Sequence, residues 1–164
     1  MQRLILLRHG KAESTPPSGG DFERGLTERG RRESALIGRA LAEAGCVPDL
    51  VLVSTARRAM ETWEAASAAF PKARMAPARE LYHASPEALS EAIETASATS
   101  RALMIVGHNP GLHELSLALA ANRRGRALGD GFPTAAAAVF EIDSDGGYTL
   151  ERFLTPRQHG GGAA

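Results

Sequence analysis

Two histidines and up to three arginines occupy positions from which they could act together on a phosphate group. Arg8 and His9 follow a short apolar run at the N-terminus, Arg58 follows a second apolar run, and His108 follows a third. A phosphoryl group in transfer spreads negative charge over three equatorial oxygens, which guanidinium groups can hold in place. A neutral imidazole can attack phosphorus and form a phosphohistidine that water later hydrolyses. These residue types therefore indicate phosphoryl transfer through a histidine.

Two residues beside these histidines favour anion binding. Gly10 has no side chain, so a phosphate or a neighbouring loop could approach its backbone closely. Asn109 precedes Pro110 and could cap a following helix, whose positive end would then face the anion. We therefore expect Gly10 and Asn109 to help bind the substrate.

A metal site is the competing interpretation of the histidines, because imidazole is a common metal ligand. His9, His83 and His108 could form one, but the neighbouring arginines would repel the ion. Cys46 is the only cysteine in the sequence, which excludes a site built on several thiolates and an intramolecular disulfide. We expect no metal and no other cofactor, and we interpret His83 and His113 as polar residues outside the chemistry.

The elements that must position these residues follow an alternating pattern. Three apolar runs, at 4–7, 50–53 and 103–106, are each followed by a polar turn and a helix-like stretch. Their continuous apolar character is typical of strands buried on both faces of a parallel sheet. The sequence therefore predicts an α/β fold with three layers, α/β/α, around a mostly parallel central sheet. In such a sheet, ligands bind outside the carboxyl ends of the strands, where the candidate residues lie.

Four helices and a hairpin complete the prediction. Thr27 is an N-cap for a helix that Gly45 ends, and Ser85-Pro86 opens another. A further helix is expected at about 57–70, and one follows Asn109-Pro110. Segments 136–142 and 148–153 are expected to pair as a hairpin at the sheet edge.

Length and charge limit the remaining possibilities. The 164 residues fit one domain, predicted at 1–154, with a loose tail at 155–164. Nineteen basic and nineteen acidic residues give zero net charge, which argues against nucleic-acid or anionic-membrane binding. The N-terminal apolar run is too short for a signal peptide or a membrane span, and we expect a cytoplasmic protein. Two loops, 13–25 and 122–134, should lie near the site; we interpret Arg123, Arg124 and Arg126 as solvated.

Four ordered motifs carry a resemblance to the histidine phosphatase superfamily, which includes the phosphoglycerate mutases. The resemblance covers roughly residues 3–120. The short length and three further segments are most similar to SixA-type phosphohistidine phosphatases. The four motifs are Leu7-Arg8-His9-Gly10, Leu26-Thr27-Glu28-Arg29-Gly30, Ser54-x-x-x-Arg58-Ala59-x-x-Thr62 and Gly107-His108-Asn109; the SixA-like segments are Asp21-x-x-Arg24-x-Leu26-Thr27, Leu81-Tyr82 and Gly107-His108-Asn109-Pro110-Gly111-Leu112.

The resemblance implies a phosphoglycerate mutase-like fold and a role for each matched residue. It makes His9 the nucleophile, Arg8 and Arg58 the clamps on the phosphate, and His108 the second histidine of the pocket. It also places Arg24 among the substrate-binding residues. The motif sets its arginine four residues after the serine, which favours Arg58 over its neighbour Arg57.

The resemblance matches the general acid less well. Larger family members supply a carboxylate after the third sheet element, and Glu80 is the nearest candidate here. Glu80 is equally compatible with an exposed loop position. A phosphohistidine substrate would tolerate a missing acid, because a departing imidazole needs less protonation than an alkoxide.

These observations lead to a phosphatase that acts through a phosphohistidine on His9. The expected partner is a phosphorylated protein, for example a histidine-phosphorylated signalling or carrier protein, or a small phosphorylated metabolite. A small-molecule phosphomonoesterase, a phosphoglycerate mutase-like enzyme and a non-catalytic phosphate-binding module are the alternatives. A mutase must enclose its substrate, and the segment between Ala73 and Pro86 has no room for an added lid.

Overall fold

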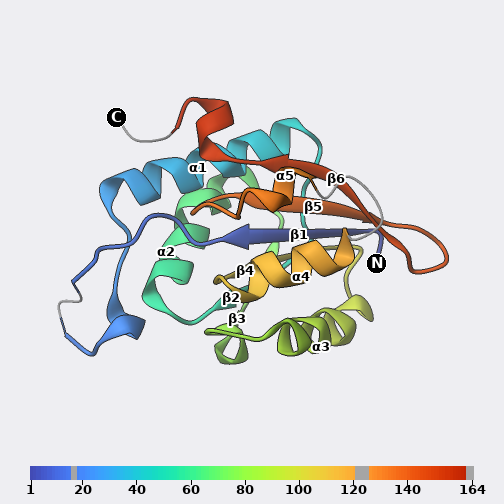
Figure 1. Cartoon of the computed structure of the whole chain (residues 1–164), viewed down its shortest axis with the longest axis horizontal. Helices are drawn as coiled ribbons and strands as arrows, with labels where there is room; N and C mark the ends of the chain where they lie inside the picture. Colours follow the sequence, from blue (N-terminus) through green and yellow to red (C-terminus); the bar gives the residue numbers. More distant parts are fainter. Residues whose placement is uncertain (16–17, 121–125, 162–164) are drawn as a thin grey trace.

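One six-stranded sheet organises the chain, in a computed structural model that describes residues 1–15, 18–120 and 126–161 (Figure 1). The strand order is β3-β2-β4-β1-β5-β6. The first four strands in this order are parallel to one another, and β5 runs antiparallel to both of its neighbours, β1 and β6. The strands are β1 (Arg3–Arg8), β2 (Leu50–Ser54), β3 (Arg74–Ala78), β4 (Ala102–Gly107), β5 (Ala137–Ile142) and β6 (Tyr148–Leu154). The predicted α/β fold with a mostly parallel sheet is confirmed.

Strand β1 shows why the central runs are apolar throughout. Leu4 and Leu6 face one hydrophobic cluster, Ile5 and Leu7 face the other, and all four side chains are fully buried. Successive side chains of a strand point to opposite faces, so a strand covered on both sides needs apolar residues at every position.

Helices cover both faces of the sheet. One cluster contains Ile37 and Trp63, from the first two helices, and the other contains Leu89 and Leu112, from the next two. The helices are α1 (Glu28–Glu43), α2 (Arg57–Ala66), α3 (Pro86–Ser97), α4 (Gly111–Leu119) and the short α5 (Arg126–Gly129), with 3-10 turns η1 (Asp21–Glu23), η2 (Ser67–Ala69), η3 (Arg79–Leu81) and η4 (Pro156–His159). The result is the expected three-layer arrangement.

The predicted helix starts and the hairpin are present. Thr27 Oγ1 accepts a hydrogen bond from Gly30 N at 3.0 Å, and Ser85 Oγ accepts one from Ala88 N at 3.1 Å. Strands β5 and β6 pair antiparallel across the turn that contains Asp143. Helix α2 is shorter than predicted, because its last turn before Phe70 is the 3-10 turn η2.

Two segments differ from the sequence interpretation. Strand β3 was not anticipated: its residues are mostly exposed and include Pro77, which an edge strand tolerates. The expected loose tail begins instead with an ordered turn, in which Pro156 is buried and Thr155 caps η4. Arg123 and Arg124 lie outside the described residues, and so does the side chain of Arg126. No helix among the described residues is long and apolar enough to span a membrane.

Candidate active site

The carboxyl ends of β1 and β4 bring the two predicted histidines together. Arg8 pairs with Gly107 in the parallel ladder, so the residues that follow, His9 and His108, leave the sheet side by side. Their ring centroids are 5.2 Å apart. They line a pocket of about 250 Å³ with Arg8, Lys11, Ala12, Asp21, Arg24, Arg58, His83, Asn109 and Thr134.

His9 is held as a neutral imidazole with one nitrogen available for attack. Its Nδ1 lies 2.7 Å from the Gly10 carbonyl oxygen, which can only accept, so Nδ1 carries the proton and Nε2 has the free electron pair. Burial lowers the pKa of His9 to about 4, and the charges of Arg8 and Arg58 act in the same direction. At neutral pH His9 is therefore an unprotonated nucleophile.

His108 is oriented by Ser54 at the end of β2. Its Nε2 lies 2.7 Å from Ser54 Oγ, which itself accepts from Ala56 N and so can donate its own proton to Nε2. In that tautomer, Nδ1 carries the remaining proton, and this atom is buried without a hydrogen-bond partner among the residues that the structure describes. Burial lowers the pKa of His108 to about 3, with His9 and Arg58 adding to the effect. A neutral His108 thus keeps one donor for a ligand oxygen.

The two predicted clamps are anchored and still have donors to spare. Arg8 Nη1 donates to the Phe132 carbonyl oxygen at 2.9 Å, and Arg8 Nε is buried without a partner among the described residues. Arg58 is 2% exposed, and its η nitrogens donate to the Asp21 carbonyl oxygen, the Asp21 carboxylate and His83 Nε2. A guanidinium has five N–H groups, so Arg58 retains two for an anion.

Asp21 is a pocket residue that the sequence interpretation did not single out. Its carboxylate accepts hydrogen bonds from Tyr82 Oη at 2.6 Å, Arg24 Nε at 2.9 Å and Arg58 Nη2 at 3.0 Å. The hydrogen bond from Tyr82, followed by those from the arginines, holds the pKa of Asp21 far below its ordinary value. Asp21 is therefore ionised at neutral pH and fixes Arg58 from the loop 13–25. Its position three residues before Arg24 was visible in the sequence, but its pairing with Arg58, 37 residues away, was not.

Glu80, the candidate acid, lies outside this pocket. It is an exposed residue of η3 and lines a separate hollow beside β2 and β3, together with Leu50 and Arg74. In the turn η3, Leu81 is buried, and the Tyr82 that follows donates a hydrogen bond to Asp21. Glu80 therefore lies on the outer surface. The assignment of Glu80 to the substrate is therefore corrected.

Gly10 has a close neighbour, as one of the two expectations had it, and Asn109 lies at the pocket without the expected cap. A Cβ on Gly10 would lie 2.6 Å from the Gly30 carbonyl oxygen and 2.7 Å from Ser34 Oγ. The missing side chain thus allows α1 to pack closely against this turn, and Gly10 is not among the residues that line the pocket. Asn109 lines the pocket but does not cap α4: the N-cap position is Pro110, and Asn109 Nδ2 donates to the Phe132 carbonyl oxygen.

The remaining candidates divide between the pocket and the surface. Arg24 and His83 line the pocket. His113 lies elsewhere, with its Nε2 at 2.6 Å from the Leu128 carbonyl oxygen. Arg57 is exposed and pairs with Glu61. Within the described part of the chain, no group of three or more His, Cys, Asp or Glu side chains is arranged to hold a metal ion.

Comparison with known proteins identifies related sequences and folds. The family model of the histidine phosphatase superfamily (branch 1) matches residues 4–82. An uncharacterized protein of Mycobacterium tuberculosis is 33% identical over 83% of this chain and 87% of its own length. A 2,3-bisphosphoglycerate-dependent phosphoglycerate mutase of Nocardioides is 44% identical, but over 36% of this chain and 25% of the mutase.

Two solved structures share the fold over nearly their whole length. The first, described as the "putative phosphohistidine phosphatase SixA" of Agrobacterium tumefaciens, has a TM-score of 0.85 and 35% identity, and the match covers 94% of this chain and 98% of that one. The second, the protein histidine phosphatase SixA complexed with tungstate, has a TM-score of 0.81 at 23% identity, covering 95% of this chain and 98% of that one. The second likeness concerns the fold alone.

Proposed function

Because the chain belongs to the histidine phosphatase superfamily, we propose that it removes phosphate from phosphohistidine in a protein, through a phosphoryl intermediate on His9. The proposed nucleophile is His9 Nε2. Arg8 and Arg58 hold the phosphoryl oxygens, and His108 Nδ1 donates to one of them.

The observation that carries this proposal is the set of hydrogen bonds that the Asp21 carboxylate accepts from Tyr82, Arg24 and Arg58. Asp21 is the one carboxylate among the described residues that line the pocket, and its lowered pKa prevents it from donating a proton at neutral pH. Alkyl phosphates need such a donor, because an alkoxide is a poor leaving group. The imidazole of a phosphohistidine leaves with much less help. The pocket therefore suits a P–N bond better than a P–O bond to an alkyl group.

The reaction divides into two displacements at phosphorus. In the first, the electron pair of His9 Nε2 forms a P–N bond while the P–N bond of the substrate breaks, and the leaving imidazole takes its proton from water. His9 is then a phosphoimidazolium, and its Nδ1 proton remains bonded to the Gly10 carbonyl oxygen, which stabilises the positive charge. In the second, water attacks phosphorus, the bond to Nε2 breaks, and inorganic phosphate leaves.

One similarity supports the proposal. The Agrobacterium structure at 35% identity is described as a phosphohistidine phosphatase, with that assignment itself provisional. The partial match to phosphoglycerate mutases keeps a mutase or a small-molecule phosphomonoesterase as the second candidate.

A substrate panel tests the proposal. Purified protein is given a histidine-phosphorylated carrier protein, a phosphoserine peptide, phosphoglycerate and an aryl phosphate, with inorganic phosphate and product isomers measured. We expect turnover of the phosphohistidine and aryl substrates, and rapid quench should trap a phosphoenzyme that is labile in acid and stable in base.

Two variants test whether the phosphoryl intermediate forms on His9. His9→Ala should abolish turnover and the trapped phosphoenzyme, while His159→Ala, which removes an exposed histidine of η4, should match the wild type. Full activity of His9→Ala would show that His9 is not the nucleophile. Isomerisation of phosphoglycerate without release of phosphate would favour the mutase.

A further inference from the structure

We propose that a second cavity beside the catalytic pocket, lined by Arg29, Thr134 and Arg157, receives a carboxylate side chain of the phosphorylated partner protein. This inference rests on the proposed function and concerns how the substrate is recognised. The cavity has a volume of about 520 Å³, and Glu33, Pro133, Thr155, Pro156 and Gly161 complete its lining.

The topology places both cavities on one edge of the sheet. Strand β5 is antiparallel to β1, and β6 is antiparallel to β5, so β5 begins and β6 ends at the edge where β1 ends. Thr134 precedes β5 and lines both the catalytic pocket and the second cavity. A ligand whose phosphoryl group lies against His9 can therefore extend over Thr134 into the second cavity.

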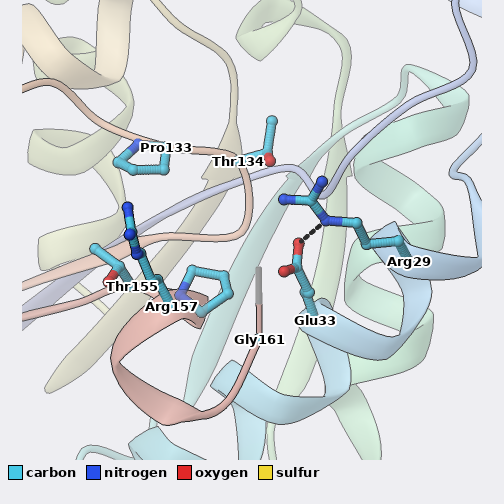
Figure 2. Close-up of a pocket in the computed structure, with 8 residues that line it drawn as sticks. Arg29, Glu33, Pro133, Thr134, Thr155, Arg157 and Gly161 are labelled. Carbon is cyan, nitrogen blue, oxygen red and sulfur yellow. Dashed lines mark hydrogen bonds and ion pairs between the residues drawn. The ribbon is translucent and has the colours of Figure 1, made fainter. Parts of the chain in front are cut away.

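The charges of the second cavity favour an anion. Arg157 is exposed, and its side chain takes part in no hydrogen bond or ion pair within the described residues. Arg29 donates through Nε to Glu33 Oε1 at 3.3 Å, which leaves its η nitrogens without a partner among these residues. Figure 2 shows Arg157 on the η4 side of the cavity, across from Arg29 and Glu33 of α1, with Pro133 and Thr134 along the upper edge in this view. The lining thus contains two guanidinium groups and one carboxylate, that of Glu33.

The sizes of the two cavities favour a polypeptide ligand. The catalytic pocket, at about 250 Å³, is below the usual range for a whole small-molecule ligand, and it suits one phosphorylated side chain. The second cavity is about twice as large and lies beyond Thr134. A protein substrate would fill both with side chains from one surface, and an acidic side chain matches the arginines. Lys11 and Arg24 extend the basic rim on the catalytic side.

The test uses two phosphohistidine peptides that differ only in flanking charge, one with glutamates around the phosphohistidine and one with glutamines. Arg157→Gln and Arg157→Glu remove and reverse the free charge, and Arg39→Gln, on the exposed side of α1, is the matched control. We expect the wild type to prefer the glutamate peptide. Arg157→Gln should raise KM for that peptide about two- to fivefold, as for an exposed ion pair, with kcat unchanged. Arg157→Glu should have a larger effect in the same direction.

The glutamine peptide and free phosphohistidine serve as reference substrates. All variants should treat them like the wild type, and the preference for the glutamate peptide should fade in high salt. Equal KM values for the glutamate peptide in the wild type and Arg157→Glu would overturn the inference. An Arg157 effect on phosphoglycerate but on neither peptide would assign the cavity to a metabolite anion and overturn it as well. Failure of the wild type to hydrolyse any phosphohistidine substrate would instead refute the proposed function, and the inference with it.

Discussion

The adjacent residues Arg57 and Arg58 allow the phosphate clamp to be tested with an internal control. Arg58 is 2% exposed and points into the pocket, whereas Arg57 is exposed and bonded to Glu61. Arg58→Ala removes the two N–H groups that remain for the phosphoryl oxygens, together with a positive charge. Loss of one donor aimed at a transition state costs about 2.7–4 kcal/mol, or roughly 10²–10³ in rate. We expect a loss of at least this size in kcat.

The same reasoning gives a small effect for Arg57→Ala. Glu61 keeps its bonds from Leu26 N and Arg31, so stability should change by less than about 0.5 kcal/mol and the rate should stay near that of the wild type. Arg58→Lys should recover only part of the activity, because an ammonium group keeps the charge without the planar fork.

The assay is single-turnover hydrolysis of an aryl phosphate, which isolates formation of the phosphoenzyme from its breakdown. Thermal unfolding of each variant separates lost catalysis from lost structure. Asp21 keeps Arg24 and Tyr82 as partners in Arg58→Ala, so that variant should remain folded. If Arg57→Ala were the impaired enzyme and Arg58→Ala the active one, both the motif register and the assigned clamp would be wrong.

Two further predictions concern the acid and the histidines. Glu80→Gln should leave the rates for alkyl phosphate, aryl phosphate and phosphohistidine within about twofold of the wild type, since Glu80 lies outside the pocket. If Glu80→Gln slowed only the hydrolysis of the alkyl phosphate, Glu80 would be the general acid after all. The pH profile of kcat/KM should fall on the acid side near pH 4 rather than near 6.5, because the pKa of His9 is lowered to about 4. The unfolded chain binds more protons at His9 than the folded chain between these values. The free energy of unfolding, measured with urea, should therefore decrease as pH falls from 6.5 to 4, and less so in His9→Ala.

The sequence alone predicts the parts of the site that sit directly at strand ends. The position of His9 after β1 and of His108 after β4 follows from two apolar runs and the rule that parallel strands end at one edge. Local signals also predict the starts of α1 and α3, because Thr27 and Ser85 cap them through short-range hydrogen bonds. The hairpin of β5 and β6 follows from the turn between two strand-like segments.

Contacts between distant segments are not predictable in this way. Asp21 reaches Arg58 and Tyr82 through a loop rich in Ser, Pro and Gly, whose path no periodic pattern specifies. The position of Glu80 after a sheet element suggests the acid, but the 3-10 turn η3 leaves Glu80 exposed and directs Tyr82 toward Asp21 instead. Strand β3 has exposed residues and Pro77, so it lacks the apolar run that revealed the other parallel strands.

The low basicity of His9 and the surrounding arginines act on different steps of the proposed reaction. Burial makes His9 a weaker base than an exposed histidine, so a phosphoryl group is held less firmly on its Nε2 than on a substrate histidine. Transfer onto His9 would then be unfavourable unless Arg8 and Arg58 bind the phosphoryl oxygens more tightly than water does. The same weak basicity makes His9 a good leaving group when water attacks the intermediate. The arginines therefore drive the first displacement, and the burial of His9 favours the second, which makes hydrolysis rather than a stable phosphoenzyme the expected outcome.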